Sequence, residues 1–148
     1  MGRGLQLLIT SIVALYGVAS AEEIAGRIKT ASGDAVVVHA GKRIPAKVAD
    51  PVAMGDVVET GADGSLGITF RDASRLSIGP NSQVVIDEYV FSPLLADASF
   101  SARVKRGTLF YVSGLIAKMA PGKTNVKTPD GTVGIRGTRL LVSVADDE

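Results

Sequence analysis

The stretch that decides the fold lies near the end of the chain and reads Val126-Lys127-Thr128-Pro129-Asp130-Gly131-Thr132-Val133-Gly134-Ile135-Arg136-Gly137-Thr138-Arg139-Leu140-Leu141-Val142-Ser143-Val144. Two runs rich in β-branched residues flank Asp130-Gly131, a dipeptide that favours a tight turn. The pattern therefore predicts two strands hinged at this turn. Shorter strand pairs upstream are expected to pack against them.

The second run contains one polar group, formed by Arg136, Gly137 and Thr138. Two interpretations of its role compete. In the first, Arg136 and Thr138 bind an anionic ligand or a partner's carboxylate. In the second, which we favour, Gly137 forms a β-bulge and Arg136 is buried against a carboxylate or turn carbonyls, because a charge inside a strand is stable only when it is paired. Asp56 and Asp72 are the candidate partners.

The rest of the chain after residue 21 shows the same short alternating runs, separated by turn residues and without the apolar spacing of an amphipathic helix. An all-β domain with at most one short helix, at 113–119, is expected. Its strands and hairpins suit a compact sandwich or roll, or an irregular β-solenoid, and periodicity does not separate these. Asp63-Gly64 predicts a type I′ hairpin between residues 56–62 and 65–70. Structural roles at turns and bulges are expected for Gly55, Asp56, Gly61, Asp63, Gly64, Gly79, Asn81, Gly107, Asp130, Gly131, Arg136 and Gly137.

The first 21 residues resemble a secretory signal peptide. Arg3 precedes an apolar run at 5–17, and the small residues of Val18-Ala19-Ser20-Ala21 are followed by acidic residues. We expect cleavage after Ala21, leaving a domain at 22–148 with its core at about 26–144 and no transmembrane segment. The alternative is an uncleaved membrane anchor, which the short and partly polar run does not favour.

Composition argues against several functions. The chain has no cysteine, which excludes disulfides and thiolate chemistry, and its formal net charge of +1 argues against nucleic acid as a partner. The only histidine, His39, ends a valine-rich run, and no nucleophile motif accompanies it. Ligand spacings for zinc or calcium and phosphate-binding glycine loops are missing too. We therefore expect a non-enzymatic protein without metal or cofactor.

Several short segments in a fixed order together resemble a known family. They are Gly33-Asp34-Ala35, Gly55-Asp56-Val57-Val58-Glu59-Thr60-Gly61, Leu66-Gly67-Ile68-Thr69-Phe70-Arg71-Asp72-Ala73-Ser74, Gly79-Pro80-Asn81-Ser82, Lys105-Arg106-Gly107-Thr108, Val126-Lys127-Thr128-Pro129 and Gly134-Ile135-Arg136-Gly137-Thr138. From about Gly26 to Val144 the chain resembles the FecR domain, named after the ferric citrate regulator of Gram-negative bacteria. Where the family usually has Asp-Gly-Ser, this chain has Asp72-Ala73-Ser74. Because alanine resists positive φ, a different turn type is expected there.

The resemblance implies an exported, periplasmic or extracellular β-domain of a Gram-negative bacterium, and it carries over no catalytic residues. The anti-sigma segment and membrane span of the family's namesake have no counterpart in the sequence. We expect a sensing or regulatory module that binds an envelope protein or a small ligand, by strand addition at a sheet edge or through turn residues. The alternatives are a structural, self-associating envelope component and, least favoured, a glycan hydrolase.

Overall fold

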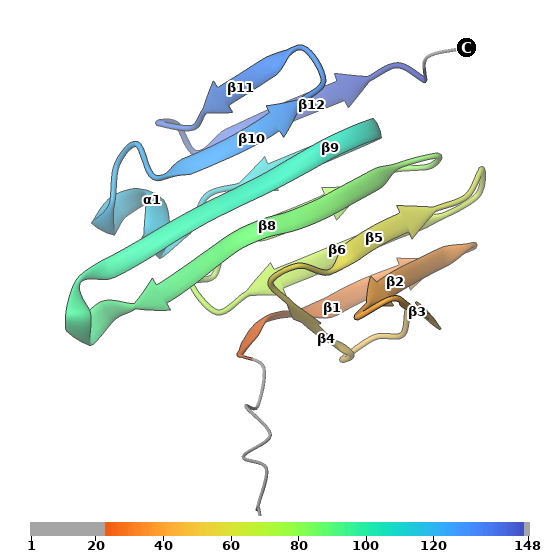
Figure 1. Ribbon diagram of the computed structural model, residues 1–148, viewed down its shortest axis with the longest axis horizontal. Coiled ribbons are helices and arrows are strands. Elements are labelled where there is room, and N and C mark those ends of the chain that lie inside the picture. Colours follow the sequence, from red (N-terminus) through yellow and green to blue (C-terminus); the bar gives the residue numbers. More distant parts are fainter. Residues whose placement is uncertain (1–22, 147–148) are drawn as a thin grey trace, which may run out of the picture.

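The computed structural model describes residues 23–146, which form an all-β domain with one short α-helix and one 3-10 turn (Figure 1). This confirms the predicted fold class. The elements are β1 (Ile24–Ser32), β2 (Ala35–His39), β3 (Lys42–Pro45), β4 (Pro51–Ala53), β5 (Val57–Thr60), β6 (Ser65–Phe70), β7 (Arg75–Ile78), β8 (Gln83–Ser92), the 3-10 turn (Pro93–Leu95), β9 (Asp97–Val112), α1 (Leu115–Met119), β10 (Thr124–Thr128), β11 (Gly131–Gly134) and β12 (Arg139–Val144).

The strands form a curled, mainly antiparallel sheet, and β9 connects its two halves. The first half of β9 lies between β8 and β10, and that half-sheet continues through β5 and β2 to β3. The second half of β9 lies between β7 and β12, and that half-sheet continues through β6 and β1 to β4. In Figure 1, β9 runs diagonally through the middle of the molecule. The result is a half-barrel with a core between its two halves.

Gly107 is the residue at which β9 passes from one half-sheet to the other. Its φ is +89°, a conformation that L side chains rarely adopt, and a Cβ built on it would lie 2.0 Å from Ser82 Oγ. Ser82 Oγ also accepts a hydrogen bond from Thr108 N at 3.0 Å. The sequence predicts that Gly107 ends a strand, whereas the strand continues through it with a change of direction.

The predicted hairpin across Asp63-Gly64 is wrong. β5 pairs with β2 and β8, whereas β6 pairs with β1 and β7, so this turn carries the chain from one half-sheet to the other. Gly64 lacks the positive φ of a type I′ turn, and its role is close packing, since a Cβ there would lie 2.0 Å from Asp34 O. A dipeptide signal cannot show that both runs find better partners elsewhere in the chain.

The turns that cross between the half-sheets stack on one another through backbone hydrogen bonds. Gly61 N donates to Asp34 O at 2.9 Å, and Gly61 O accepts from both Gly64 N and Asn81 N. Asp63 Oδ1 accepts from Asp34 N at 3.2 Å. These contacts hold the two half-sheets together along one end of the molecule.

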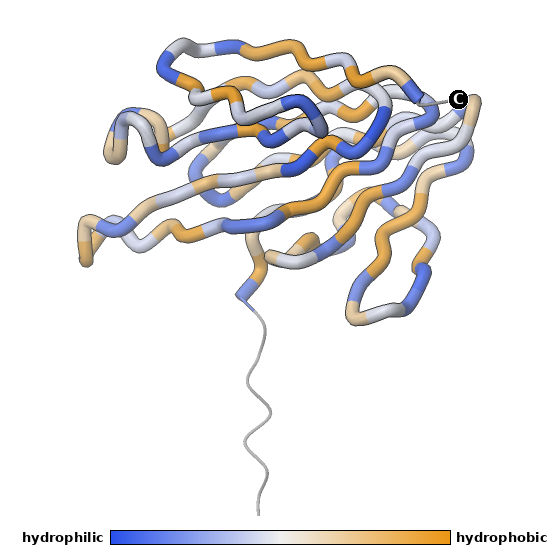
Figure 2. The backbone as a smooth tube through the Cα atoms, turned by 45° about the horizontal axis from the view of Figure 1, so that its top comes forward, coloured by the Kyte–Doolittle hydropathy of each residue, from blue (hydrophilic) through white to orange (hydrophobic). Residues whose placement is uncertain are grey.

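Hydrophobic and hydrophilic residues alternate along the strands, as the orange and blue segments of Figure 2 show, and the buried hydrophobic residues build the core. Four aromatic rings form its centre. Phe100 stacks on Tyr111 with ring centroids 5.0 Å apart, and it meets Phe70 edge to face at 5.3 Å. Tyr89 stacks on Phe70, also at 5.3 Å. The rings come from β6, β8 and both halves of β9, so they join the two half-sheets.

Buried Asp72 organises the opposite end of the core. Its carboxylate accepts hydrogen bonds from Ser74 Oγ at 2.6 Å, Tyr89 Oη at 3.1 Å and Ile116 N at 3.2 Å. Ala73, next to it, has a φ of +66°. Ala73 thus adopts the positive φ that alanine usually resists, which removes the reason for expecting a different turn type at this position.

In the stretch 126–144, a tight turn joins the paired strands β10 and β11 as predicted, but it lies one residue earlier, at Pro129-Asp130, because Gly131 already pairs with Thr128. The second run, however, is two strands, β11 and β12, separated by residues 135–138. Within residues 23–146 there is no helix with the length and apolar character needed to span a membrane.

Candidate ligand-binding groove and sheet edge

A groove of about 380 Å³ opens where the first four strands meet. β1 and β4 belong to one half-sheet and β2 and β3 to the other, so the groove lies between the two halves of the curled sheet. Its walls are mostly apolar and contain three polar side chains. The lining residues are Ile24, Val37, His39, Ile44, Pro45, Asp50, Pro51, Ala53 and Asp56.

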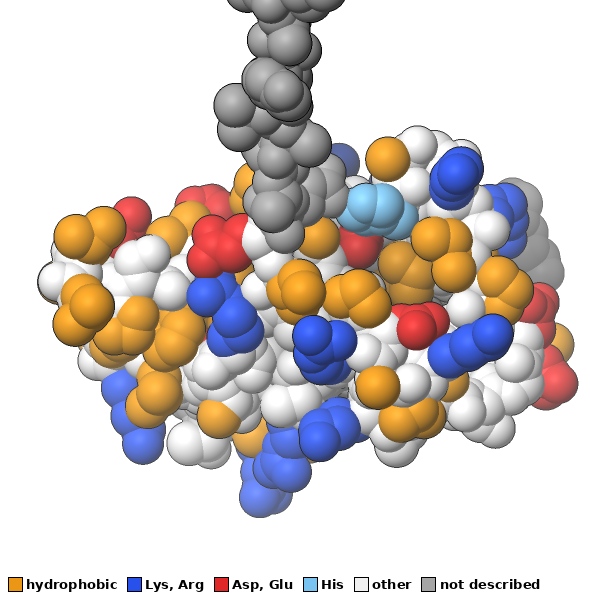
Figure 3. Space-filling model, turned by 90° about the horizontal axis from the view of Figure 1, so that it is seen from below, with side chains coloured by type: hydrophobic (Ala, Val, Ile, Leu, Met, Phe, Trp, Pro, Cys, Tyr) orange, Lys and Arg blue, Asp and Glu red, His pale blue; other side chains and the backbone are white. Residues whose placement is uncertain are grey.

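The polar part of the groove is built around buried Asp56. Its Oδ1 lies 2.5 Å from His39 Nδ1, and its Oδ2 accepts a hydrogen bond from Ala53 N at 2.9 Å. Since an ionised carboxylate only accepts hydrogen bonds, Nδ1 is the donor of this pair. Figure 3 looks onto this side of the molecule, where the pale-blue ring of the only histidine lies among orange apolar side chains. The pair fixes the orientation of the imidazole beside the apolar wall.

The His39–Asp56 pair invites comparison with a catalytic site. A histidine held by an aspartate is two thirds of a catalytic triad, but none of the described residues that line this groove is serine, threonine or cysteine. Among the residues that the structure describes, no group of three or more His, Cys, Asp or Glu side chains could hold a metal ion. What the groove offers is apolar surface with a small polar end.

Sequence reasoning misses this groove. The sequence predicts a strand-end histidine near the surface at His39, and extended connections at 44–46 and 50–51. His39 does end β2, but it is half-buried and paired with Asp56, which lies after β4. One feature of the sequence could have indicated the groove. Ile44, Pro45 and Pro51 are apolar, yet they lie in segments that proline keeps out of central strands.

Arg136 does not have the internal partner that the sequence predicts. It is exposed in the loop between β11 and β12, and within residues 23–146 no hydrogen bond or ion pair to its side chain is found. The proposed partner Asp56 binds His39, and Asp72 binds Tyr89 and Ile116. A charge in an exposed loop needs no buried partner, because water solvates it.

The predicted bulge at Gly137 is also wrong. Gly137 is outside any strand, has no positive φ, and a Cβ there would meet nothing within 4 Å. The loop is held at its ends by backbone hydrogen bonds, from Ile135 N to Thr124 O and from Ser113 N to Thr138 O, both at 2.9 Å. Arg136 and Thr138 thus lie together on the exposed surface of this loop.

The remaining turn residues behave in two ways. Gly55 and Asn81 have positive φ, +90° and +51°, as turn positions require. Gly79 and Gly131 have neither positive φ nor a contact that excludes a Cβ, although Gly79 O accepts a hydrogen bond from Thr60 Oγ1 at 2.7 Å. Asp130 lies in the turn after β10.

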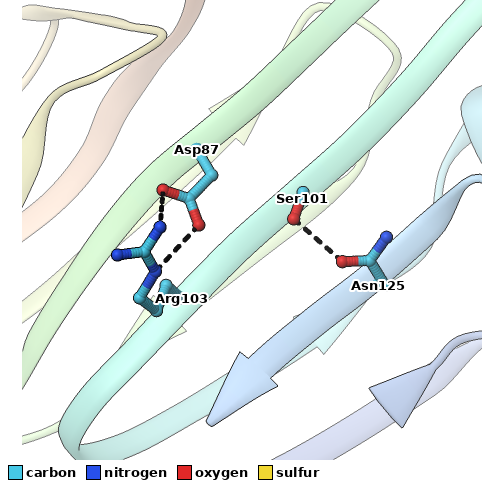
Figure 4. A network of polar contacts seen from close by, with 4 residues as sticks. All are labelled: Asp87, Ser101, Arg103 and Asn125. Carbon is cyan, nitrogen blue, oxygen red and sulfur yellow. Dashed lines mark hydrogen bonds and ion pairs between the residues drawn. The ribbon is translucent and has the colours of Figure 1, made fainter. Parts of the chain in front are cut away.

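The outer face of β8, β9 and β10 is polar and is linked by cross-strand pairs (Figure 4). Arg103 forms two hydrogen bonds to Asp87, at 3.0 and 3.2 Å, and Ser101 Oγ donates to Asn125 Oδ1 at 2.8 Å. The basic cluster at 103–106 suggests a solvated edge strand. These residues instead lie in central β9, where their charges face solvent across the sheet rather than along its edge.

Four strands end the two half-sheets: β3 and β11 on one, β4 and β12 on the other. In Figure 1, β11 and β12 lie along the upper rim of the molecule and β3 and β4 along the lower rim. On β12, Leu141 is 66% exposed, and its cross-strand neighbour Phe110 is 37% exposed. The upper rim therefore carries apolar surface that the described residues do not cover.

Comparison with known proteins identifies the family. The model of the FecR protein family matches residues 56–148, which is more than half of the chain. The match begins at Asp56, later than the resemblance from Gly26, so it omits β1–β4 and most of the groove lining. No curated protein and no solved structure matched the chain. On the strength of the family match, the chain belongs to the FecR protein family.

Proposed function

We propose that this protein is a non-enzymatic sensing module of the cell envelope that binds a small, mostly apolar ligand in the groove between β1–β4. The groove itself carries the proposal. Its volume of about 380 Å³ and its apolar walls with a few convergent polar groups are typical of small-molecule sites. Membership of a non-enzymatic, regulatory family supports a sensing role.

The lining defines the class of ligand. Ile24, Ile44 and the two prolines offer surface to an aliphatic or aromatic body. The paired side chains of His39 and Asp56 form a polar end, and Asp50 is a third polar side chain of the lining, so the groove suits a ligand with a single hydrogen-bonding group. A sugar, with hydroxyl groups on every side, would leave most of them unpaired against these walls, which argues against a glycan hydrolase.

The cellular setting is part of the proposal. The signal peptide expected at residues 1–21 falls outside the described residues. The family's association with the envelope supports export to the periplasm or the cell exterior. A change in the groove would there be passed to a partner protein of the envelope.

Indole, an aromatic molecule with one N–H donor, is a suitable probe. We expect indole to raise the melting temperature of the purified protein, because a ligand that binds only the folded state stabilises it. Ile44→Trp fills the groove from β3 and should abolish this rise. Leu94→Trp is the matched control, since Leu94 is fully exposed in the 3-10 turn, and it should leave the rise intact.

The proposal fails if indole gives no rise in the unchanged protein, or the same rise in Ile44→Trp. The alternative class, a self-associating envelope component, is favoured by one separate observation, the exposed edge of β12.

A further inference from the structure

A second hollow, of about 440 Å³, opens on the outer face of the sheet, where β9, β10 and the turn before β11 meet. Its lining contains three basic side chains and one carboxylate, so it carries an excess of positive charge. The lining residues are Arg103, Val104, Lys105, Lys127, Thr128, Pro129, Asp130, Gly131 and Thr132. The groove between β1–β4 shares none of these residues, so its proposed ligand leaves this hollow unexplained.

The strand register brings the basic side chains together. Lys127 pairs with Arg103 in the parallel ladder between β10 and β9. Lys105 and Arg103 are both exposed, on either side of buried Val104, so they share the outer face of β9. Like charges at directly opposed positions destabilise a sheet. The sheet therefore keeps a repulsion here that a bound anion would relieve.

The two lysines, Lys105 and Lys127, are the cations of the hollow without a counter-charge. Both are exposed, and within residues 23–146 neither side chain forms a hydrogen bond or an ion pair. Arg103 differs, because its guanidinium group forms two hydrogen bonds to Asp87 on β8 (Figure 4). The charge of both lysines thus stays available to a ligand.

Two of the segments that carry the family resemblance, 105–108 and 126–129, meet at this hollow. Other residues of these segments serve the fold: Gly107 lies where β9 passes between the half-sheets, and Val126 is buried in the core. The two exposed lysines have no such structural role. A binding role accounts for their position.

We propose that this hollow binds a phosphate group, held by the ammonium groups of Lys105 and Lys127 and by the hydroxyl group of Thr132. Thr132 pairs with Lys127 in the ladder between β10 and β11, so these two side chains share one face. A phosphate monoester carries nearly two negative charges at neutral pH and has three strong acceptor oxygens, and lysine is a common ligand for it. This inference concerns the outer face of the sheet and does not depend on the ligand of the groove.

Isothermal titration calorimetry with inorganic phosphate tests the site. The ionic strength is held constant with sodium chloride, because salt screens exposed charges. We expect saturable binding at one site per chain. Lys105→Gln and Lys127→Gln should each weaken this binding by about fivefold, the effect of losing one exposed ion pair. Lys118→Gln, in α1 and also exposed, is the matched control and should bind phosphate as the unchanged chain does.

Vesicles identify the source of the phosphate group. If the protein sediments with phosphatidylcholine vesicles that contain phosphatidic acid, and Lys127→Gln does not, the hollow binds a lipid headgroup. If inorganic phosphate binds and the vesicles do not, the hollow binds a soluble phosphate compound. Both results support a phosphate site at Lys105 and Lys127.

Asp130 gives the test its opposite sign, because it is the one carboxylate among the lining residues. Asp130→Asn removes a negative charge that repels the anion, so it should strengthen phosphate binding by about fivefold. An absence of saturable phosphate binding would overturn the proposal. Equal weakening by Lys127→Gln and Lys118→Gln would overturn it too, since attraction would then depend on net charge and not on the hollow.

Discussion

At the scale of single residues, Gly107 is the position where a side chain is most strongly excluded. Two features act against substitution. Its φ is +89°, and a Cβ there would lie 2.0 Å from Ser82 Oγ. We expect Gly107→Ala to lower the free energy of unfolding by about 3 kcal/mol, measured by urea denaturation.

Gly41 provides the control, because its φ is +79° but nothing lies within 4 Å of a Cβ there. Gly41→Ala should cost only about 1 kcal/mol, the backbone strain alone. Equal losses for the two variants would show that close packing against Ser82 contributes nothing.

Single residues also show where sequence reasoning fails. A bulge at Gly137, as the sequence predicts, implies that Gly137→Val costs more stability than Ala73→Gly. Gly137 lies in open space without positive φ, while Ala73 already has the conformation that glycine prefers. On the structure, neither change is expected to have a large effect. The spacing of glycines in a sequence does not show whether a turn, a close contact or neither requires them.

At the scale of elements, local patterns predict the strands better than their partners. The turn between β10 and β11 and the single α-helix follow from neighbouring residues. The pairing of β5 with β8 and of β6 with β1 does not, because these partners are distant in sequence. The groove escapes sequence reasoning for the same cause: His39 and Asp56 meet only once β2 and the turn after β4 are placed.

The junction between β8 and β9 gives an element-scale prediction. Ser82 Oγ accepts a hydrogen bond from Thr108 N at 3.0 Å and donates one to Pro80 O at 3.1 Å, so it ties the start of β8 to the second half of β9. Ser82→Ala leaves Thr108 N without this acceptor and should cost about 1–3 kcal/mol of unfolding free energy.

Exposed Ser77 on β7 is the control for this junction. Ser77→Ala should change the unfolding free energy by no more than about 0.5 kcal/mol, as is usual for surface positions. If thermal or urea denaturation finds Ser82→Ala as mild as Ser77→Ala, the hydrogen bond does not hold the two elements together.

At the scale of the whole molecule, the aromatic core makes stability depend on alkaline pH. Burial raises the pKa of Tyr111 to about 12, and the negative charge of Asp72 adds to the rise. Burial likewise raises the pKa of Tyr89, again with a contribution from Asp72. The chain from Glu22 onward contains only these two tyrosines.

The sign follows from proton binding in the two states. Below pH 10 both tyrosines are protonated whether the chain is folded or unfolded, so stability is fully present. Between pH 10 and 12 the unfolded chain releases protons that the folded chain keeps, so stability falls, by about 2–3 kcal/mol for Tyr111. Tyrosinate absorbance and circular dichroism should therefore change together. Titration near pH 10 with intact circular dichroism would contradict burial of the two hydroxyl groups.

In our proposal the groove lined by β1–β4 binds a small, mostly apolar ligand; β3 and β4 lie along the lower rim of the molecule (Figure 1). Methyl NMR spectra of the protein titrated with indole test the central claim most directly. We predict saturable shifts confined to Ile24, Val37 and Ile44, with the methyl signals of Leu94 and Leu141 unchanged. Shifts centred on Leu141, or shifts that never saturate, would contradict binding in the groove.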